Sequence, residues 1–259
     1  GTKGMVVSGH SLASTAGMRT LDKGGSLVDA MIATSAPLSV VLQQATSLGG
    51  DAFFLYHHAA DGKTIGLNAT GHAPDGATPN YYKNGIPDRG PNAVSVPGMV
   101  RGWERLHEKY GKLPWNELFE DAVDAAEAHP ASRVLCAGLD LFRDDLMADP
   151  ASRALYFNDG GERMQAGDIM RQPALAKTLR KIREGGSGVY YEGAIAKSIG
   201  EYALANGGLL GPDQFAGYEP EWVTPLSTNY RGHDVNVMPP NSYGILMLLQ
   251  LNGLSALTS

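Results

Sequence analysis

The chain has 259 residues, 43% of them hydrophobic and 19% charged, so it is long enough to bury a sizeable core and is not disordered as a whole. Its 21 basic and 27 acidic residues give a formal net charge of −6, without a basic run, which argues against nucleic acid as a partner. No apolar stretch long enough to span a membrane occurs, and no signal peptide is recognisable. These features favour a cytoplasmic protein without a membrane partner, although a leader removed before Gly1 would place it in the periplasm or outside the cell.

The N-terminal part predicts two helices followed by a β-hairpin. The first helix is expected within 10–25 and ends at a pair of glycines. The second begins at Ser26, where Asp29 completes a capping-box pattern, and it is apolar nearly all round, which predicts burial. Pro37 inside this helix predicts a kink or a break. Asp61-Gly62 between two strand-like runs predicts a hairpin over 49–69.

The remainder of the chain predicts a helical middle and strands near the end. Helices are expected over 97–111, 114–130, 136–147, 172–186 and 193–208, and strands over 221–228 and 233–240. Strands near both ends of a helical middle predict one α+β domain whose sheet is built from distant segments. The apolar run over 244–254 is expected to pack on a second polypeptide. We therefore expect that the chain alone is not a stable, complete domain.

Residue chemistry alone gives only a weak functional signal. His57 and His58 are adjacent on a strand and point to opposite faces, no zinc-binding His motif occurs, and Cys136 is the single cysteine, so no metal or cofactor is expected. No G-x-S-x-G sequence marks a serine nucleophile. The glycine-rich stretch over 185–193 follows a helix rather than a strand, which predicts a flexible connection and not a phosphate loop. His72 alone is more often a half-exposed turn histidine than a site residue.

Several segments, taken in order, nevertheless resemble the large-subunit part of the γ-glutamyltranspeptidase family. They are MVVSGHSLASTAGMRTLDKGGSLVDAMIATSAPLSVV, SLGGDAFFLY, NATGHAP, PNAVSVPGMVRGWERLHEKYGKLPW and GGLLGPDQFAGYEPEWVTPLSTNYRGHDVNVMPPNSYG. The resemblance covers nearly the whole chain.

The resemblance implies an N-terminal-nucleophile hydrolase with an αββα sandwich, made as a precursor that cuts itself. The cut frees a threonine whose hydroxyl is the nucleophile and whose α-amine is the base, which suits a hydroxyl that is weak at neutral pH. Residues 1–259 would form the large (α) subunit, with the nucleophile on a small (β) subunit from the same precursor that this chain does not contain. Thr258 is not assigned as the nucleophile, and no catalytic residue is assigned here. A dimer of such heterodimers remains open.

The NATGHAP segment departs from the family pattern, and this departure defines the candidate substrate-binding residues. Typical transpeptidases resemble Asp-Phe-Arg-Glu-x-Ala-Pro here, with an arginine that clamps the α-carboxylate of the γ-glutamyl group, and Thr70 takes its place. Other members read Gly-Ser-Gly-Arg-Ala-Pro, and their arginine aligns with His72. The candidate substrate-binding residues are Thr70, Gly71, His72, Asn241, Ser242 and Tyr243. The last three lie in the loop over 239–244, which is expected near the nucleophile, although a plain surface turn is almost as well supported.

The sequence leaves two alternative hypotheses for the function. One is an amide hydrolase or acyl transferase with altered acyl specificity, acting on small-molecule amides of γ-glutamyl, oxamate-like or cephalosporin side-chain type. The other is a catalytically inactive relative that serves as a binding or scaffold protein. If an arginine from elsewhere replaces the missing clamp, Arg89 and Arg101 are the first candidates. An imidazole is mostly neutral at pH 7, so His72 would replace that clamp only in part.

Overall fold

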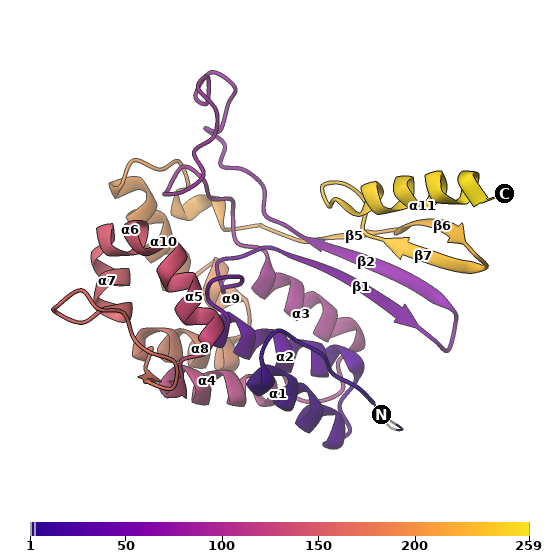
Figure 1. The fold of residues 1–259 in the computed structure, drawn as a ribbon, viewed down its shortest axis with the longest axis horizontal. Coiled ribbons are helices and arrows are strands. Elements are labelled where there is room, and N and C mark those ends of the chain that lie inside the picture. Colours follow the sequence, from indigo (N-terminus) through magenta and orange to yellow (C-terminus); the bar gives the residue numbers. More distant parts are fainter. Residues whose placement is uncertain (1, 3, 259) are drawn as a thin grey trace. The chain divides into compact units, whose positions relative to one another are not determined.

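The computed structural model describes residues 2 and 4–258 (Figure 1). The chain divides into two compact units. The first unit comprises the chain up to Leu48 together with Leu106–Ile195, and the second comprises Gly49–Arg105 together with the chain from Ala196 onward. Each unit is therefore assembled from segments that are distant in the sequence. Helices α3 (Met99–Tyr110) and α10 (Ala194–Ala205) each contain a boundary between the units.

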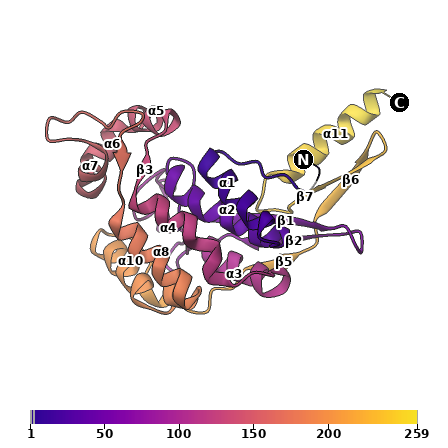
Figure 2. The same ribbon diagram turned by 90° about the horizontal axis from the view of Figure 1, so that it is seen from below.

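The first unit is mainly helical. Its elements are α1 (Ser11–Asp22), α2 (Leu27–Val41), the 3-10 helix η1 (Trp115–Phe119), α4 (Glu120–Glu127), β3 (His129–Pro130), α5 (Arg133–Leu141), α6 (Arg143–Ala148), α7 (Pro150–Tyr156), β4 (Ile169–Met170), α8 (Pro173–Gly185) and α9 (Gly188–Tyr191). Helices α1 and α2 lie side by side in both views (Figures 1 and 2).

Helix α2 is the buried helix that the sequence predicts. Ser26 caps it: its Oγ accepts the N–H of Asp29 at 3.0 Å, and the Asp29 carboxylate accepts the N–H of Ser26 at 2.7 Å. This reciprocal pair confirms the predicted capping box. The expected break at Pro37 does not occur, because the helix continues to Val41. Pro37 and most of its helical neighbours are buried, and this packing offsets the backbone hydrogen bond that the proline removes.

Two predicted helices of the first unit are interrupted. The segment over 114–130 begins as η1 and becomes α4, and the segment over 136–147 divides between α5 and α6 at Phe142. The glycine-rich stretch expected to be a flexible connection instead contains α9, in which Tyr190 and Tyr191 are buried. The Tyr190 hydroxyl donates to the carbonyl of Leu48 at 3.0 Å. Burial of two aromatic rings stabilises this short helix despite its glycines.

The second unit contains the sheet built from distant segments. Strands β1 (Ala52–His58) and β2 (Lys63–Ala69) form the predicted antiparallel hairpin, and β5 (Glu221–Val223) pairs antiparallel with β2. The expected strand over 221–228 is interrupted before β6 (Leu226–Tyr230), which pairs with β7 (His233–Val237) in a separate two-stranded sheet. Pro225 lies between the two segments, and proline cannot donate to a sheet ladder.

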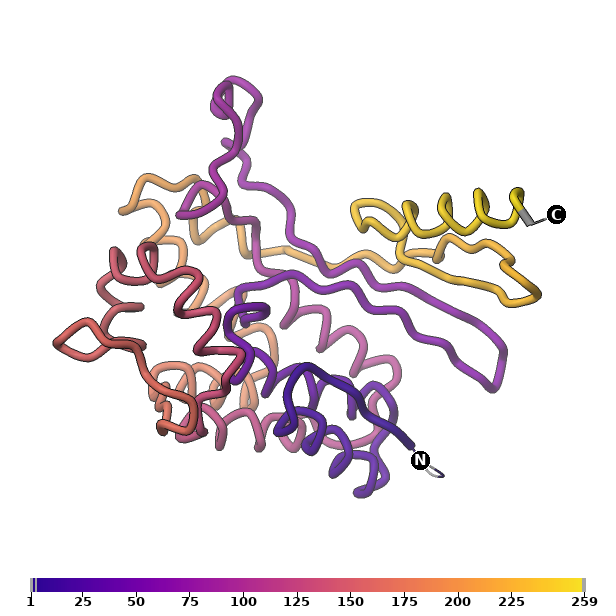
Figure 3. Tube along the Cα trace, in the orientation of Figure 1, coloured from indigo at the N-terminus to yellow at the C-terminus, as the bar shows by residue number. Residues whose placement is uncertain are grey.

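Helices pack on both sheets of the second unit. An added Cβ at Gly102 of α3 would lie 2.7 Å from both the Ala69 Cβ and the Phe54 ring, so the helix lies directly on the β1–β2 hairpin. Helix α11 (Gly244–Thr258) contacts β6 and β7 (Figure 2). Between β2 and α3 the chain makes a long excursion that contains only turns and bends (Figure 3). The η2 turn (Pro212–Gln214) precedes β5.

Among residues 2 and 4–258, none of the helices combines the length and the apolar character needed to cross a bilayer.

Candidate functional site

The sequence-predicted Thr70 lies where β2 ends, in a small hydrogen-bonded cluster with two asparagines. Its hydroxyl donates to the Asn68 Oδ1 at 2.8 Å and accepts from the Asn241 Nδ2 at 3.1 Å. The Asn68 Nδ2 in turn donates to the Asn241 Oδ1 at 3.1 Å. Thr70 and Asn241 are 171 residues apart in the sequence, and the fold brings these two predicted residues into direct contact.

Gly71 is required at its position by a close backbone approach. A Cβ added there would lie 1.4 Å from the carbonyl oxygen of Val96, which no side chain could tolerate. Its N–H donates to the Asp51 Oδ1 at 2.8 Å, and the neighbouring carbonyl of His72 accepts the N–H of Val96 at 3.1 Å. The two ends of the excursion between β2 and α3 are therefore held together at this turn.

The His72 side chain is exposed, and its ring centre lies 6.1 Å from the ring centre of Tyr218. Tyr218 is buried, and its hydroxyl donates to the carbonyl oxygen of Thr70 at 3.2 Å. Burial raises the pKa of this phenol above its ordinary value, and the nearby carboxylates of Asp51 and Glu219 raise it further. Tyr218 therefore stays neutral at physiological pH and acts here as a hydrogen-bond donor.

Asp51 follows two glycines and precedes β1, and its carboxylate contacts the turn at Gly71. Its Oδ1 accepts from the Gly71 N–H, and its Oδ2 accepts more weakly from the Ser95 hydroxyl at 3.5 Å. The surrounding protein raises the pKa of Asp51 by desolvation, and the hydrogen bonds from Gly71 and Ser95 oppose this shift. These two hydrogen bonds fix the position of the Asp51 carboxylate against the turn.

The three residues of the 239–244 loop differ in their roles. Only the Asn241 side chain joins the Thr70 cluster. The Ser242 hydroxyl donates to the carbonyl of Met238 at 2.7 Å and accepts the N–H of Gly244 at 3.2 Å, so it stabilises the start of α11. The Tyr243 side chain is 85% exposed.

Sequence reasoning missed Asp51, Asn68 and Tyr218 as members of this cluster. Asp51 and Asn68 stand within the quoted SLGGDAFFLY and NATGHAP motifs, but no local rule singles them out. Tyr218 contacts Thr70 across 148 residues of sequence, and only the fold reveals that contact.

Arg101, a candidate for the missing clamp, is already committed to other groups. Its side chain is 6% exposed, and its guanidinium lies 3.3 Å from the Glu104 carboxylate and 3.7 Å from the Glu219 carboxylate. Arg105 binds Glu219 through two nitrogens, at 2.6 and 2.5 Å. A guanidinium buried against two carboxylates is poorly placed to bind the carboxylate of a substrate.

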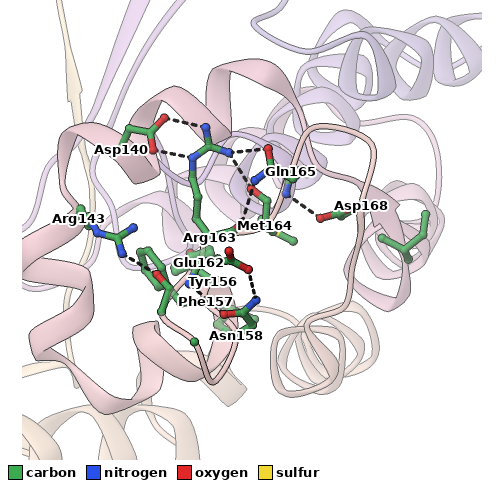
Figure 4. A pocket seen from close by; sticks show the side chains of 14 residues that line it. Asp140, Arg143, Tyr156, Phe157, Asn158, Glu162, Arg163, Met164, Gln165 and Asp168 are labelled. Atoms are coloured by element: carbon green, nitrogen blue, oxygen red, sulfur yellow. Dashed lines mark hydrogen bonds and ion pairs between the residues drawn. The ribbon is translucent and has the colours of Figure 1, made fainter.

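A hollow of about 810 Å³ lies in the first unit, among side chains from α5 to β4 (Figure 4). Both of its arginines bind neighbouring protein groups: Arg163 makes a paired contact with Asp140 at 2.6 and 2.8 Å, and Arg143 donates to the carbonyl of Gly161 at 2.5 Å. We assign no substrate to this hollow, because its polar groups are directed at neighbouring protein atoms rather than into the space.

Within the described part of the chain, no group of three or more His, Cys, Asp and Glu side chains is placed to hold a metal ion. His57 lies 2.9 Å from the Thr64 hydroxyl, and His58 lies 3.0 Å from the Asp61 carboxylate. Cys136 is buried in α5, in keeping with a packing role.

Known proteins resemble this chain in sequence and in fold. The family model described as Gamma-glutamyltranspeptidase matches residues 13–259. The Glutathione hydrolase-like YwrD proenzyme of Bacillus subtilis (strain 168) is 39% identical over 256 residues, which are 97% of this chain and 49% of that protein. The crystal structure of Helicobacter pylori gamma-glutamyltranspeptidase has a TM-score of 0.90 at 32% identity, covering 96% of this chain and 73% of that chain. The cephalosporin acylase from Bacillus halodurans has a TM-score of 0.86 at 33% identity, covering 93% and 47%.

These likenesses define an α+β fold of the N-terminal-nucleophile hydrolase type. The chain belongs to the γ-glutamyltranspeptidase family, since the family model matches nearly all of it. It spans about half the length of the curated relatives it matches.

Proposed function

We propose that residues 1–259 are the large-subunit part of an amide hydrolase or acyl transferase. Its nucleophile would be an N-terminal threonine on a small subunit released from the same precursor. Acyl transfer to that threonine would form an acyl-enzyme, from which water or an amine takes the acyl group. The names of two relatives, proenzyme and acylase, support processing and amide chemistry of this kind.

The contact between Thr70 and Asn241 carries the proposal. Thr70 belongs to the turn at the position of the family's carboxylate clamp, and Asn241 belongs to the loop expected beside the nucleophile. The Asn241 Nδ2 lies 3.1 Å from the Thr70 hydroxyl oxygen. A neutral hydroxyl and an amide at that point offer donors and acceptors but no cation. We therefore propose that Thr70, Gly71, His72 and Asn241 bind the acyl group. Ser242 and Tyr243 complete the loop, Ser242 as its structural support and Tyr243 as an exposed contact for substrate or for the small subunit.

The mass of the purified protein tests this proposal. The protein expressed from its complete coding sequence should give two fragments, the second beginning with threonine. It should also release the aniline from at least one small acyl anilide, and replacement of that threonine by alanine should abolish both results. A single uncleaved mass together with no turnover would favour the inactive binding or scaffold protein instead.

The exposed apolar side chains of helix α11 support the proposal of a polypeptide partner. Although the helix contacts β6 and β7, many of its apolar side chains are exposed, namely Ile245, Leu246, Met247, Leu249, Leu254 and Leu257. We expect residues 1–259 expressed alone to bind a dye specific for apolar surface, and the complete processed protein to bind much less. Equal, low dye binding by both, with a cooperative unfolding transition of the isolated chain, would contradict a partner at this helix.

A further inference from the structure

Asp51 is the charged side chain that lies directly against the acyl-binding turn proposed above. Its Oδ1 is 2.8 Å from the Gly71 nitrogen, in the residue next to Thr70, and its Oδ2 is 3.5 Å from the Ser95 hydroxyl. Gly71 and Ser95 stand near opposite ends of the excursion between β2 and α3. The carboxylate therefore lies against the turn, and these two hydrogen bonds fix its position.

No cation compensates this carboxylate in the described residues. Asp51 makes no ion pair there, since its partners are the N–H of Gly71 and the hydroxyl of Ser95. The two arginines of α3 in the same unit, Arg101 and Arg105, are paired with Glu104 and Glu219. Asp51 also contributes to the raised pKa of Tyr218, whose hydroxyl contacts the Thr70 carbonyl. The turn therefore lies in the field of an unneutralised negative charge.

We propose that Asp51 is a specificity-determining residue that selects acyl groups by charge. An acyl group ending in a carboxylate at Thr70 would meet a like charge with no cation between them. One ending in a methyl group would avoid that repulsion, and one ending in an ammonium group would be attracted. The proposal deepens the proposed function and rests on it: the substrate class becomes amides whose acyl group is neutral or cationic at its far end.

Three anilides of similar acyl length test this selection: the glutaryl, valeryl and γ-aminobutyryl p-nitroanilides, which end in a carboxylate, a methyl and an ammonium group. The complete processed protein is compared with its Asp51→Asn variant. The asparagine oxygen can still accept from Gly71 and its amide can donate to Ser95, so the variant removes the charge and keeps the hydrogen bonds. In the variant, kcat/KM for glutaryl relative to valeryl should rise by about tenfold or more, and γ-aminobutyryl relative to valeryl should fall.

The matched control is Asp88→Asn, which removes an exposed carboxylate from the same excursion, 17 residues after Gly71 in the sequence. It should leave both ratios unchanged. Unaltered ratios in Asp51→Asn would overturn the proposal. Loss of self-cleavage or of valeryl turnover in that variant would also overturn it, because the carboxylate would then hold the turn instead of selecting charge. No turnover of any anilide by the wild type would refute the proposed function itself, a result distinct from both.

Discussion

Replacing Asp29 by alanine should lower the free energy of unfolding by about 3–5 kcal/mol. The side chain is fully buried, and its Oδ2 accepts three backbone N–H groups, from Ser26 at 2.7 Å, Lys112 at 2.9 Å and Leu113 at 3.1 Å. Alanine would leave these donors without an acceptor inside the first unit. It would also remove half of the capping box of α2 and the Oδ1 that lies 3.7 Å from the His107 Nε2.

Urea unfolding of the complete protein measures this effect. Asp29→Asn keeps an acceptor oxygen for the three N–H groups and should cost much less than the alanine variant. Asp22→Ala, an exposed aspartate at the end of α1, is the matched control and should change stability by no more than about 0.5 kcal/mol. A cost for Asp29→Ala no larger than this control would show that water replaces the carboxylate, and the structural role argued here would be wrong.

Asp29 also shows how far sequence reasoning reaches. The capping box is a local pattern of Ser26 and Asp29, and the sequence predicts it correctly. The bonds from Asp29 to Lys112 and Leu113 span 83 and 84 residues, and no local pattern contains them. The interruption between β5 and β6 is only partly predictable from the sequence. Pro225 is a local signal for the interruption, but the pairing of each strand with a different partner depends on the fold.

In the candidate site too, some residues come from sequence patterns and others are found only in the fold. Thr70, Gly71, His72 and Asn241 were named because of the family resemblance, whose motifs are continuous in sequence. The sequence does not single out Asp51, because its proposed importance comes from its contact with the Gly71 N–H and not from its neighbours in sequence. The location of the site therefore stays a prediction from sequence patterns, whereas the charge beside it is visible only in the structure.

The substitution Thr70→Arg should raise kcat/KM for γ-glutamyl anilide. If Thr70 and Asn241 bind the acyl group as proposed, a γ-glutamyl α-carboxylate at this position would meet the Thr70 hydroxyl and the Asn241 amide instead of a guanidinium at position 70. Losing one partner of a buried charge pair costs about 2–5 kcal/mol, so the wild type should turn over γ-glutamyl anilide roughly 30-fold to several thousand-fold less well than an enzyme with the clamp. The arginine variant should recover part of that factor, because a guanidinium binds a carboxylate through two parallel hydrogen bonds.

The recovery will be limited by Asp51. An arginine at position 70 would lie one residue from Gly71, whose N–H contacts the Asp51 carboxylate, and the new guanidinium would pair with that carboxylate in competition with the substrate. We therefore expect the double variant, Thr70→Arg with Asp51→Asn, to exceed Thr70→Arg in kcat/KM for γ-glutamyl anilide. Thr70→Lys is the control, since a point charge lacks the paired geometry and should gain less.

If the wild type already turns over γ-glutamyl anilide as well as neutral anilides, the clamp argument fails. Arg89 would then be the first residue to replace, because Arg101 is buried against Glu104 and Glu219.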